Sequence, residues 1–224
     1  MEQSFKRGYA NELIFYGRIS ELFGSNSVIT MSLAIRCEEK ERQYYYPKIL
    51  FYDAEKKQEL TDMKPADFVK VQCHLETIAD YKNTKKHLPY QSIVGDSIEK
   101  VMEEYAPDNC NRVNVSGYVV NERIPEAHPG MVRLSIMTRR NYHEARIHAL
   151  VYTQQAEYIT DIIRKNDFLY TVGIVETRRK ASLGRWVTYE DYVIKEIYRE
   201  NQETKKLRRI YAHDSVLEKE KMKQ

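Results

Sequence analysis

The sequence predicts an all-β fold with short helices, built as two tandem five-stranded β-barrels. The first of three observations is an internal repeat: the segment from Asn11 to Ile19 has a counterpart one hundred residues later, from Asn111 to Val119. Six further residues keep this offset, namely Leu50, Tyr52, Asp67, Phe68, Glu76 and Thr77, which recur as Leu150, Tyr152, Asp167, Phe168, Glu176 and Thr177. The second is that hydrophobic and polar residues alternate in both copies, as in half-buried strands. The third is a content of 18 tyrosines, a residue suited to such strands.

Length and charge agree with two small domains. The 224 residues suffice for two cores, and the repeat divides them into residues 1–105, residues 106–200 and a basic C-terminal tail, residues 201–224. We expect the tail to form a short docking helix. Lys plus Arg against Asp plus Glu is 15 to 17 in residues 1–104, 14 to 12 in residues 105–200 and 7 to 4 in the tail. Because neither copy is strongly basic, any binding of nucleic acid must depend on where cations cluster.

Composition also indicates where the protein is found. No apolar run is long enough to cross a bilayer, and the N-terminal residues lack the apolar core of a signal peptide. Cys37, Cys73 and Cys110 are odd in number and lack metal-type spacing, which is typical of a reducing compartment. We therefore expect a cytoplasmic protein that makes no contact with membranes.

The first copy contains five segments with strand-like patterns. They are residues 10–22, 28–36, 44–52, 68–77 and 88–101, with room for only a short helix in residues 59–66. Pro47 cannot donate to a ladder, so we expect it at a strand edge or bulge. Gly17 suits the sharp bend that a small barrel imposes on its first strand.

The second copy repeats this order. Its expected strands are residues 112–124, 131–139, 143–153, 168–177 and 185–198. Within residues 154–165, Ala156, Ile159, Ile162 and Ile163 recur at helical spacing, which predicts an amphipathic helix. Five strands with a helix between the third and the fourth form the order of an OB-fold, a small barrel that often binds oligonucleotides or oligosaccharides.

Four segments of the first copy resemble the bacterial single-stranded-DNA-binding protein family. They are residues 11–19, 29–35, 49–51 and 68–77, and the second copy resembles the family more weakly through residues 111–119 and 167–177. The resemblance implies the form of this family that has two OB-folds in one chain and pairs into homodimers. Members that recruit other enzymes end in an acidic tail tipped by phenylalanine, whereas this chain ends in a slightly basic segment, so that route of recruitment is not supported.

The same resemblance implies which residues stack on bases. The family uses aromatic residues of its third strand and of neighbouring loops, and by position these are Tyr45 and Phe51. Their counterparts in the second copy, Ala145 and Val151, cannot stack on a base. We therefore expect the two copies to contribute unequally to binding, with the first copy stacking on bases and the second mainly supplying charge.

Binding of a single strand without sequence specificity requires flat side chains and cations that follow the phosphates. Between strands four and five lie Lys82, Lys85 and Lys86 in the first copy and Arg178, Arg179, Lys180 and Arg185 in the second. Arg139 and Arg140, expected between strands two and three, add a third cluster with Tyr142 beside it, and Trp186 with Tyr189 and Tyr192 forms a weaker stacking set. A charged turn is otherwise ordinary solvated surface, but basic clusters at equivalent places in both copies favour binding. Because Tyr44, Tyr45 and Tyr46 are consecutive, at least one of them must point outward.

Enzymatic functions have no support in the sequence. It contains no nucleophile motif, phosphate-binding glycine loop or paired-histidine metal signature, so we expect no catalysis, no metal, no cofactor and no small-molecule substrate. Our leading hypothesis is a homodimer that binds single-stranded DNA, or RNA, without sequence specificity, in replication or recombination. The alternative is an OB-fold protein–protein interaction module of a replication or mobile-element complex, and the nearly balanced charge of the first copy favours it.

Overall fold

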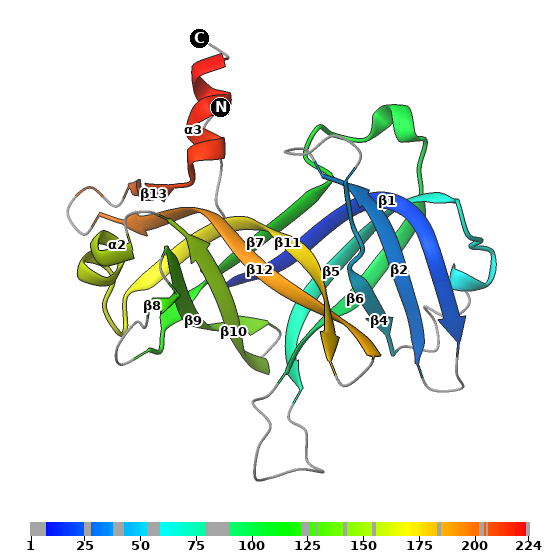
Figure 1. Cartoon of the computed structure of the whole chain (residues 1–224), viewed down its shortest axis with the longest axis horizontal. Helices are drawn as coiled ribbons and strands as arrows, with labels where there is room; N and C mark the ends of the chain where they lie inside the picture. The colour runs from blue at the N-terminus through cyan, green and yellow to red at the C-terminus, as the bar shows by residue number, and fades with distance from the viewer. Residues whose placement is uncertain are drawn as a thin grey trace. The chain divides into compact units, whose positions relative to one another are not determined.

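The computed structural model describes residues 8–24, 28–37, 43–52, 59–78, 90–121, 126–128, 130–140, 143–153, 156–182, 185–201, 204 and 206–222 (Figure 1). The chain forms two compact units. The first-copy unit consists of Glu12–Arg112 and Val175–Asp191, and the second-copy unit consists of Met1–Asn11, Val113–Ile174 and Tyr192–Gln224. Each unit thus includes a segment that belongs, by sequence, to the other copy. The division at residues 105 and 106 stays a prediction about the chain's repeats.

The first-copy unit is a closed five-stranded barrel. Its elements are β1 (Ala10–Gly24), β2 (Ile29–Arg36), β3 (Tyr44–Tyr45), β4 (Lys48–Phe51), β5 (Phe68–Ile78), β6 (Tyr90–Lys100) and the 3-10 helix η1 (Glu103–Tyr105). The ring runs β1–β2–β4–β6–β5 and back to β1. All of these pairs are antiparallel except β4 with β6, which is parallel. This order confirms the predicted all-β class and OB-fold.

Close approach between strands explains the glycine of β1. A Cβ atom at Gly17 would lie 2.7 Å from the carbonyl oxygen of Ala34 on β2, and at Gly117 it would lie 2.1 Å from that of Met137. Any side chain at either position would separate the two strands. Pro47 interrupts the third expected strand, dividing it into β3 and β4, and its carbonyl still accepts a hydrogen bond from the N–H of Leu33. The expected position of this proline at a strand irregularity is confirmed.

The second-copy unit contains elements in the same order. They are β7 (Asn111–Val119), β8 (Glu126–His128), β9 (Met131–Arg140), β10 (His143–Tyr152), α2 (Ala156–Ile162), β11 (Phe168–Ser182), β12 (Arg185–Glu200), β13 (Leu207–Ala212) and α3 (Asp214–Met222). Antiparallel pairs join β7 to β9, β9 to β10 and β7 to β11, whereas β10 and β12 are parallel. The predicted helix between the third and fourth strands is α2, and it buries Ile159 and, just beyond its end, Ile163.

The turn before the fourth strand has the same structure in both copies. In the first, Ala66 has a φ of 74° and its N–H donates to the carbonyl of Ile19, while the carboxylate of Asp67 accepts the N–H of Lys64 at 2.8 Å. The corresponding residues of the second copy are Asn166 (φ 70°), Val119, Asp167 and Arg164, with the same two hydrogen bonds. The sequence repeat is therefore also a repeat of local backbone geometry.

The structure differs from expectation in the tail and in the basic segments of the second copy. The tail contains a short helix, α3 (Asp214–Met222), but Leu207–Ala212 before it is strand β13, which pairs with β12. Pairing provides partners for backbone groups along the edge of β12. The basic segment from Arg178 to Lys180, expected in a turn, continues strand β11, and Arg139 and Arg140 end strand β9. No helix among the described residues is long and apolar enough to cross a membrane.

Candidate nucleic-acid interface

The third strand of the first-copy barrel presents an outward row of tyrosines. Along β3 and β4 exposed and buried residues alternate, and the outward positions hold Tyr44, Tyr46, Lys48, Leu50 and, directly after β4, Tyr52. The three tyrosines are 46%, 38% and 45% exposed, and the ring centroids of Tyr44 and Tyr46 are 6.4 Å apart. We call these five residues the tyrosine row. Three flat rings and one ammonium group are the components that a sequence-independent single-strand site requires.

The two stacking candidates carried over by resemblance lie on the opposite, inward face of this strand. Phe51 is fully buried, and a Cβ atom added at Gly95 of β6 would lie 2.2 Å from its ring. Tyr45 is 8% exposed, and its hydroxyl accepts a hydrogen bond from the thiol of Cys37. These two rings pack the core of the barrel and offer no face to a base. Since side chains alternate with period two, a shift of one residue exchanges the core row for the outward row.

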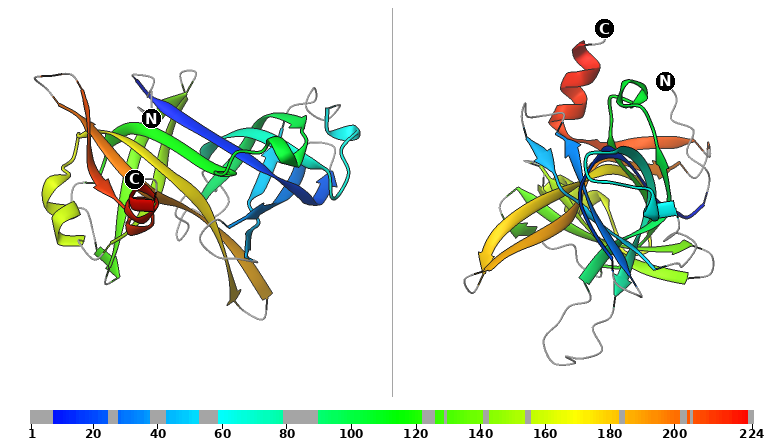
Figure 2. Two further views of the ribbon diagram at one scale, coloured as in Figure 1. Left: turned by 90° about the horizontal axis from the view of Figure 1, so that it is seen from above. Right: turned by 90° about the vertical axis from the view of Figure 1, so that its right-hand side faces the viewer.

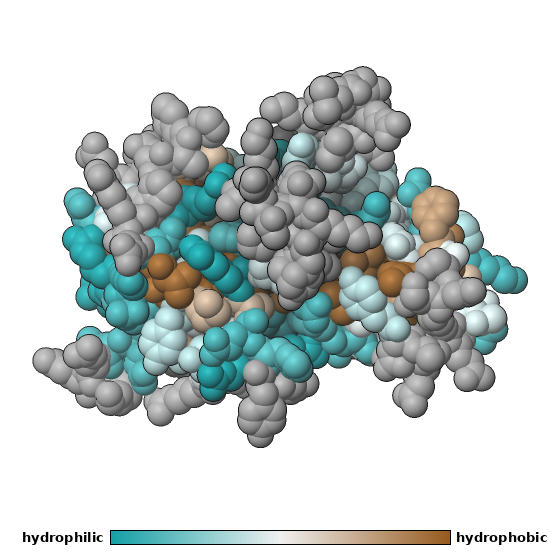
Figure 3. Space-filling view, turned by 90° about the horizontal axis from the view of Figure 1, so that it is seen from below, coloured by the Kyte–Doolittle hydropathy of each residue, from teal (hydrophilic) through white to brown (hydrophobic). Residues whose placement is uncertain are grey.

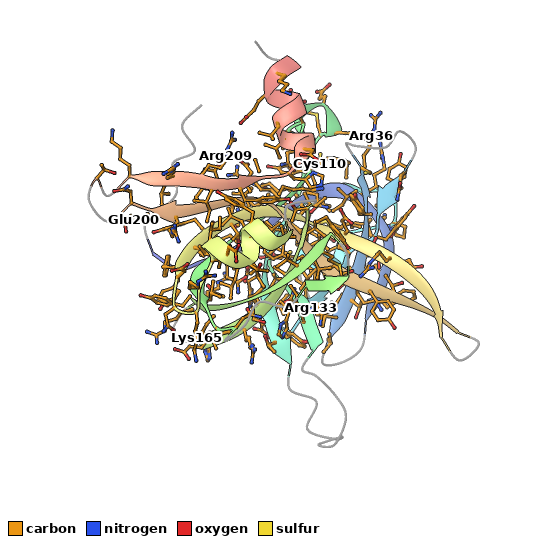
Figure 4. The ribbon with its side chains drawn as sticks, turned by 60° about the vertical axis from the view of Figure 1, so that its left-hand side comes forward. Arg36, Cys110, Arg133, Lys165, Glu200 and Arg209 are labelled. Carbon is orange, nitrogen blue, oxygen red and sulfur yellow. The ribbon has the colours of Figure 1, made fainter. Side chains whose placement is uncertain are left out.

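The neighbouring strand β2 leaves the tyrosine row uncovered. Opposite Leu50 and Lys48 it places Thr30 and Ser32, whose side chains are small. Residues directly opposite one another on antiparallel strands point to the same face, so these small side chains flank the row. Opposite Tyr44 lies Arg36, an exposed cation that projects from the end of β2 (Figure 4).

Side chains of β11 and β12 bind backbone N–H groups of this strand that precede the part of β4 paired with β6. The backbone N–H of Tyr46 donates to Oγ1 of Thr177 at 2.8 Å, and the N–H of Lys48 donates to Oε1 of Glu190 at 2.5 Å. Burial raises the pKa of Glu190 to about 7, although its hydrogen bond from Lys48 acts in the opposite direction. At neutral pH this carboxyl group is therefore divided between its protonated and ionised forms.

The second copy has a charged row where the first has tyrosines. On β10 the outward positions hold Glu144, Arg146 and His148, and the opposing strand β9 adds Arg133 and Arg139. Arg139 forms an ion pair with Glu144 at 2.7 Å. Burial lowers the pKa of His148, and the nearby Arg146 and Arg133 lower it further. Chemically, this surface attracts anions but offers little stacking area.

Aromatic residues also gather on the outer side of β7 and β11. Phe168 is half-buried, and the rings of Tyr9, Tyr118 and Tyr170 lie 4.9 to 5.5 Å from it, centroid to centroid. Tyr9 comes from the N-terminal segment, and the guanidinium of Arg139 lies 5.8 Å from its ring centroid. Phe168 forms the centre of this partly exposed cluster. Through Tyr9, the N-terminal segment packs against β7 and β11 of its own unit.

Of the remaining predicted site residues, the structure places the side chains of Arg178 and Arg140. Arg178 is exposed and pairs with Asp191 at 2.6 Å, and Arg140 is half-buried at the end of β9. Lys82, Lys85, Lys86 and Tyr142 lie outside the described residues, as do the side chains of Arg179, Lys180, Arg185 and Trp186. In the part of the chain that the structure describes, no three His, Cys, Asp or Glu side chains gather as metal ligands. Figure 3 shows one face of the molecule, on which hydrophobic residues form separate patches among hydrophilic ones.

Comparison with known proteins supports the fold. No protein-family model matches this chain, and no curated protein sequence matches it. Among solved structures, wild-type single-stranded DNA binding protein from Thermus aquaticus is similar with a TM-score of 0.62 and 14% identity, covering 93% of this chain and 98% of that chain. A deletion variant of that protein has a TM-score of 0.62 and 13% identity, covering 88% of this chain and 98% of its own. At this level of identity the likeness shows a shared fold.

Proposed function

We propose that this protein binds single-stranded DNA without sequence specificity, and that the tyrosine row of the first-copy barrel is its principal stacking surface. One observation carries the proposal: exposed tyrosines alternate with core residues on the third strand of a closed OB-fold barrel. The outer face of the second and third strands is where OB-folds bind oligonucleotides. Bases of any identity have a flat face, so stacking on tyrosine does not select sequence.

Charge has a separate role in this proposal. Lys48 and Arg36 flank the tyrosines, and in the second copy Arg133 and Arg146 line the equivalent strands. We propose that the first copy supplies most of the stacking and the second copy mostly neutralises phosphates. The structural likeness to a single-stranded DNA binding protein supports a role of this kind, and we extend it to the protection of single strands during replication or recombination.

Titration of fluorescent oligo-dT with the intact protein at two salt concentrations tests the proposal. We expect binding at low salt and weaker binding at high salt, because each neutralised phosphate releases counterions. An oligo-rU of the same length tests the preference for DNA over RNA. Absence of binding to either oligonucleotide at low salt would refute the proposal and leave the alternative, a protein–protein interaction module.

A further inference from the structure

The last residues of β1 lie on the same outer face of the first-copy barrel as the tyrosine row. Figure 1 and Figure 2 show β1 as a long curved strand, drawn in blue, and its last part runs beside β2. Phe23 of β1 lies opposite Thr30 of β2, and Thr30 lies opposite Leu50 of β4. Residues directly opposite one another on antiparallel strands point to the same face. Phe23 therefore points to the face on which Leu50 belongs to the tyrosine row.

A β-bulge in β1 gives the side chain of Phe23 this direction. Up to Ile19 the odd-numbered residues of the strand face the core, and unbroken alternation would bury Phe23 as well. Between Ile19 and Glu21 the register shifts, and one extra residue is inserted. Beyond the bulge Leu22 lies opposite the buried Met31, so Phe23 faces outward. Bulges often redirect a side chain next to a functional site.

One small side chain separates the ring of Phe23 from the tyrosine row. Phe23 is 63% exposed, more than any tyrosine of the row, and its neighbour on β2 is a threonine. Adjacent strands lie about 4.8 Å apart, so the backbones of β1 and β4 are roughly 10 Å apart at this level. Stacked nucleotides are spaced by ~3.4 Å, and about three of them span this distance. A single strand that crosses the sheet can therefore contact both β4 and Phe23.

The charges on this face indicate which part of a bound strand would lie over β1. Glu21 lies opposite Ser32, and Ser32 lies opposite Lys48, so an exposed carboxylate and an exposed ammonium group flank β2 on the same face. Phosphates are attracted to Lys48 and repelled by Glu21. At the end of β1 the strand would therefore be held through a base, on the ring of Phe23, rather than through a phosphate.

We propose that Phe23 is a further stacking residue of the first-copy site, and that the bound strand crosses the barrel from the tyrosine row over Thr30 to the end of β1. This inference rests on the function proposed above. It adds one residue to the stacking surface and assigns a path to the strand. The ligand is the same single-stranded nucleic acid.

The affinity of Phe23 variants for oligo-dT, measured in the full chain, tests the stacking role. Phe23→Ala should weaken binding at least about 5-fold, as removal of one stacking partner does. Phe23→Tyr keeps a flat ring and should bind like the wild type, whereas Phe23→Leu keeps only an apolar side chain and should bind as weakly as Phe23→Ala. The matched control, Tyr105→Ala, removes a ring that is 70% exposed on η1 of the same unit and should not change binding. Wild-type affinity in Phe23→Leu would show that the ring does not stack.

A change of charge beside Phe23 tests the path of the strand. Glu21→Gln removes the carboxylate from the proposed crossing and should strengthen binding roughly 2- to 5-fold at low salt. The gain should shrink at high salt, because salt screens the repulsion. Glu104→Gln on η1 removes an exposed carboxylate away from the crossing and should have a smaller effect. Equal affinities of Glu21→Gln and Glu104→Gln at low salt would contradict a crossing at the end of β1.

Phe23→Trp gives a local readout that does not depend on a loss of affinity. The emission of an indole is quenched when a base stacks on it. Saturating oligo-dT should therefore quench Phe23→Trp more strongly than the wild type, which has one tryptophan, and more strongly than Tyr105→Trp. Equal quenching of the three proteins would refute the contact between Phe23 and a base.

The outcomes distinguish this inference from the proposed function. If the wild type does not bind oligo-dT, the proposed function fails. If Tyr46→Ala weakens binding but Phe23→Ala binds normally, the function stands and Phe23 is not part of the site. Light scattering after size-exclusion chromatography compares the molar masses of the wild type and Phe23→Ala, and circular dichroism reports whether each variant is folded. A lower mass in Phe23→Ala would assign Phe23 to a contact between copies of the chain and contradict its role in binding the strand.

Discussion

The ring and the backbone N–H of Tyr46 face different surroundings. Its ring faces outward in the tyrosine row, while its backbone N–H is held by the hydroxyl of Thr177. This hydrogen bond already orders the strand that carries the ring. Stacking of a base on the ring therefore costs little further conformational entropy of the protein. Tyr44 lies two residues earlier and faces the same way.

For these two residues, Tyr44→Ala and Tyr46→Ala should each lower affinity for oligo-dT by about 1 to 3 kcal/mol, since each removes a stacking ring. Thermal unfolding should change little, because both rings are exposed. Fluorescence titration measures the affinity, with Tyr158→Ala as the control for loss of an exposed tyrosine. Equal affinities for all three variants and the wild type would mean that the tyrosine row does not contact the strand.

The residues before the fourth strand have a different effect, on stability. Ala66 and Asn166 both adopt positive φ, a conformation that strains alanine more than asparagine. We expect Ala66→Asn to raise the free energy of unfolding by about 0.5 to 1 kcal/mol, and Asn166→Ala to lower it by a similar amount. Urea unfolding of both variants measures the two changes. The two variants should change the free energy of unfolding in opposite directions. A loss of stability in Ala66→Asn would contradict the explanation from strain.

At the scale of elements, the ends of β11 and β12, residues 175–191, contact the backbone of Tyr46 and Lys48 in a way that depends on pH. Burial raises the pKa of Glu190 from its ordinary value of 4.5 to about 7. Between these values the folded chain keeps a proton that the unfolded chain has released, so stability falls as pH rises from 4.5 to 7. Above pH 7 this loss is complete.

Glu190→Gln should therefore remove a pH dependence of about 3 kcal/mol from the free energy of unfolding in this window, at ~1.4 kcal/mol for each pKa unit. Glutamine retains an oxygen that accepts the N–H of Lys48, so the contact itself persists. Urea unfolding at pH 5 and pH 8 measures the effect, with Glu104→Gln on η1 as a control at an exposed glutamate. If wild type and Glu190→Gln lose stability equally between pH 5 and pH 8, Glu190 does not titrate there.

At the scale of the whole molecule, the repeated copies and the compact units differ. The second-copy unit includes the N-terminal segment, whose Gly8 and Ala10 carbonyls accept hydrogen bonds from the buried hydroxyls of Ser116 and Thr138. The first-copy unit includes residues 175–191, the ends of β11 and β12. Each copy thus completes its fold with a segment of the other.

Expressed separately, residues 1–105 and residues 106–224 should each be less stable than in the intact chain. A fragment that lacks its exchanged segment leaves hydrogen-bonding groups without partners, at roughly 1 to 3 kcal/mol for each buried group. Urea unfolding followed by circular dichroism compares the fragments with the intact chain. Fragments that unfold at the same urea concentration as the intact chain would show that the exchanged segments contribute nothing.

Much of the architecture follows from the sequence, because strand positions depend on local alternation. The expected strands at residues 28–36, 68–77 and 143–153 agree with β2, β5 and β10 within one or two residues, and the helical spacing around Ile159 predicted α2. Asp67 and Asp167, which keep the offset of one hundred residues in the sequence, occupy equivalent turns. The sequence predicts a turn at Arg178, but this residue lies within β11, because long β-ribbons continue through charged residues when both strands are paired.

The all-β class, the repeat and the OB-fold order can be predicted from the sequence because they depend on periodicity along the chain. Which row of the third strand faces outward depends instead on packing: alternation defines two rows, and contact of Phe51 with Gly95 assigns one of them to the core. Tertiary contacts also assign residues 175–191 of β11 and β12 to the first-copy unit. These contacts include hydrogen bonds from the backbone of Tyr46 and Lys48 to side chains more than one hundred residues away, and no local pattern records such pairs.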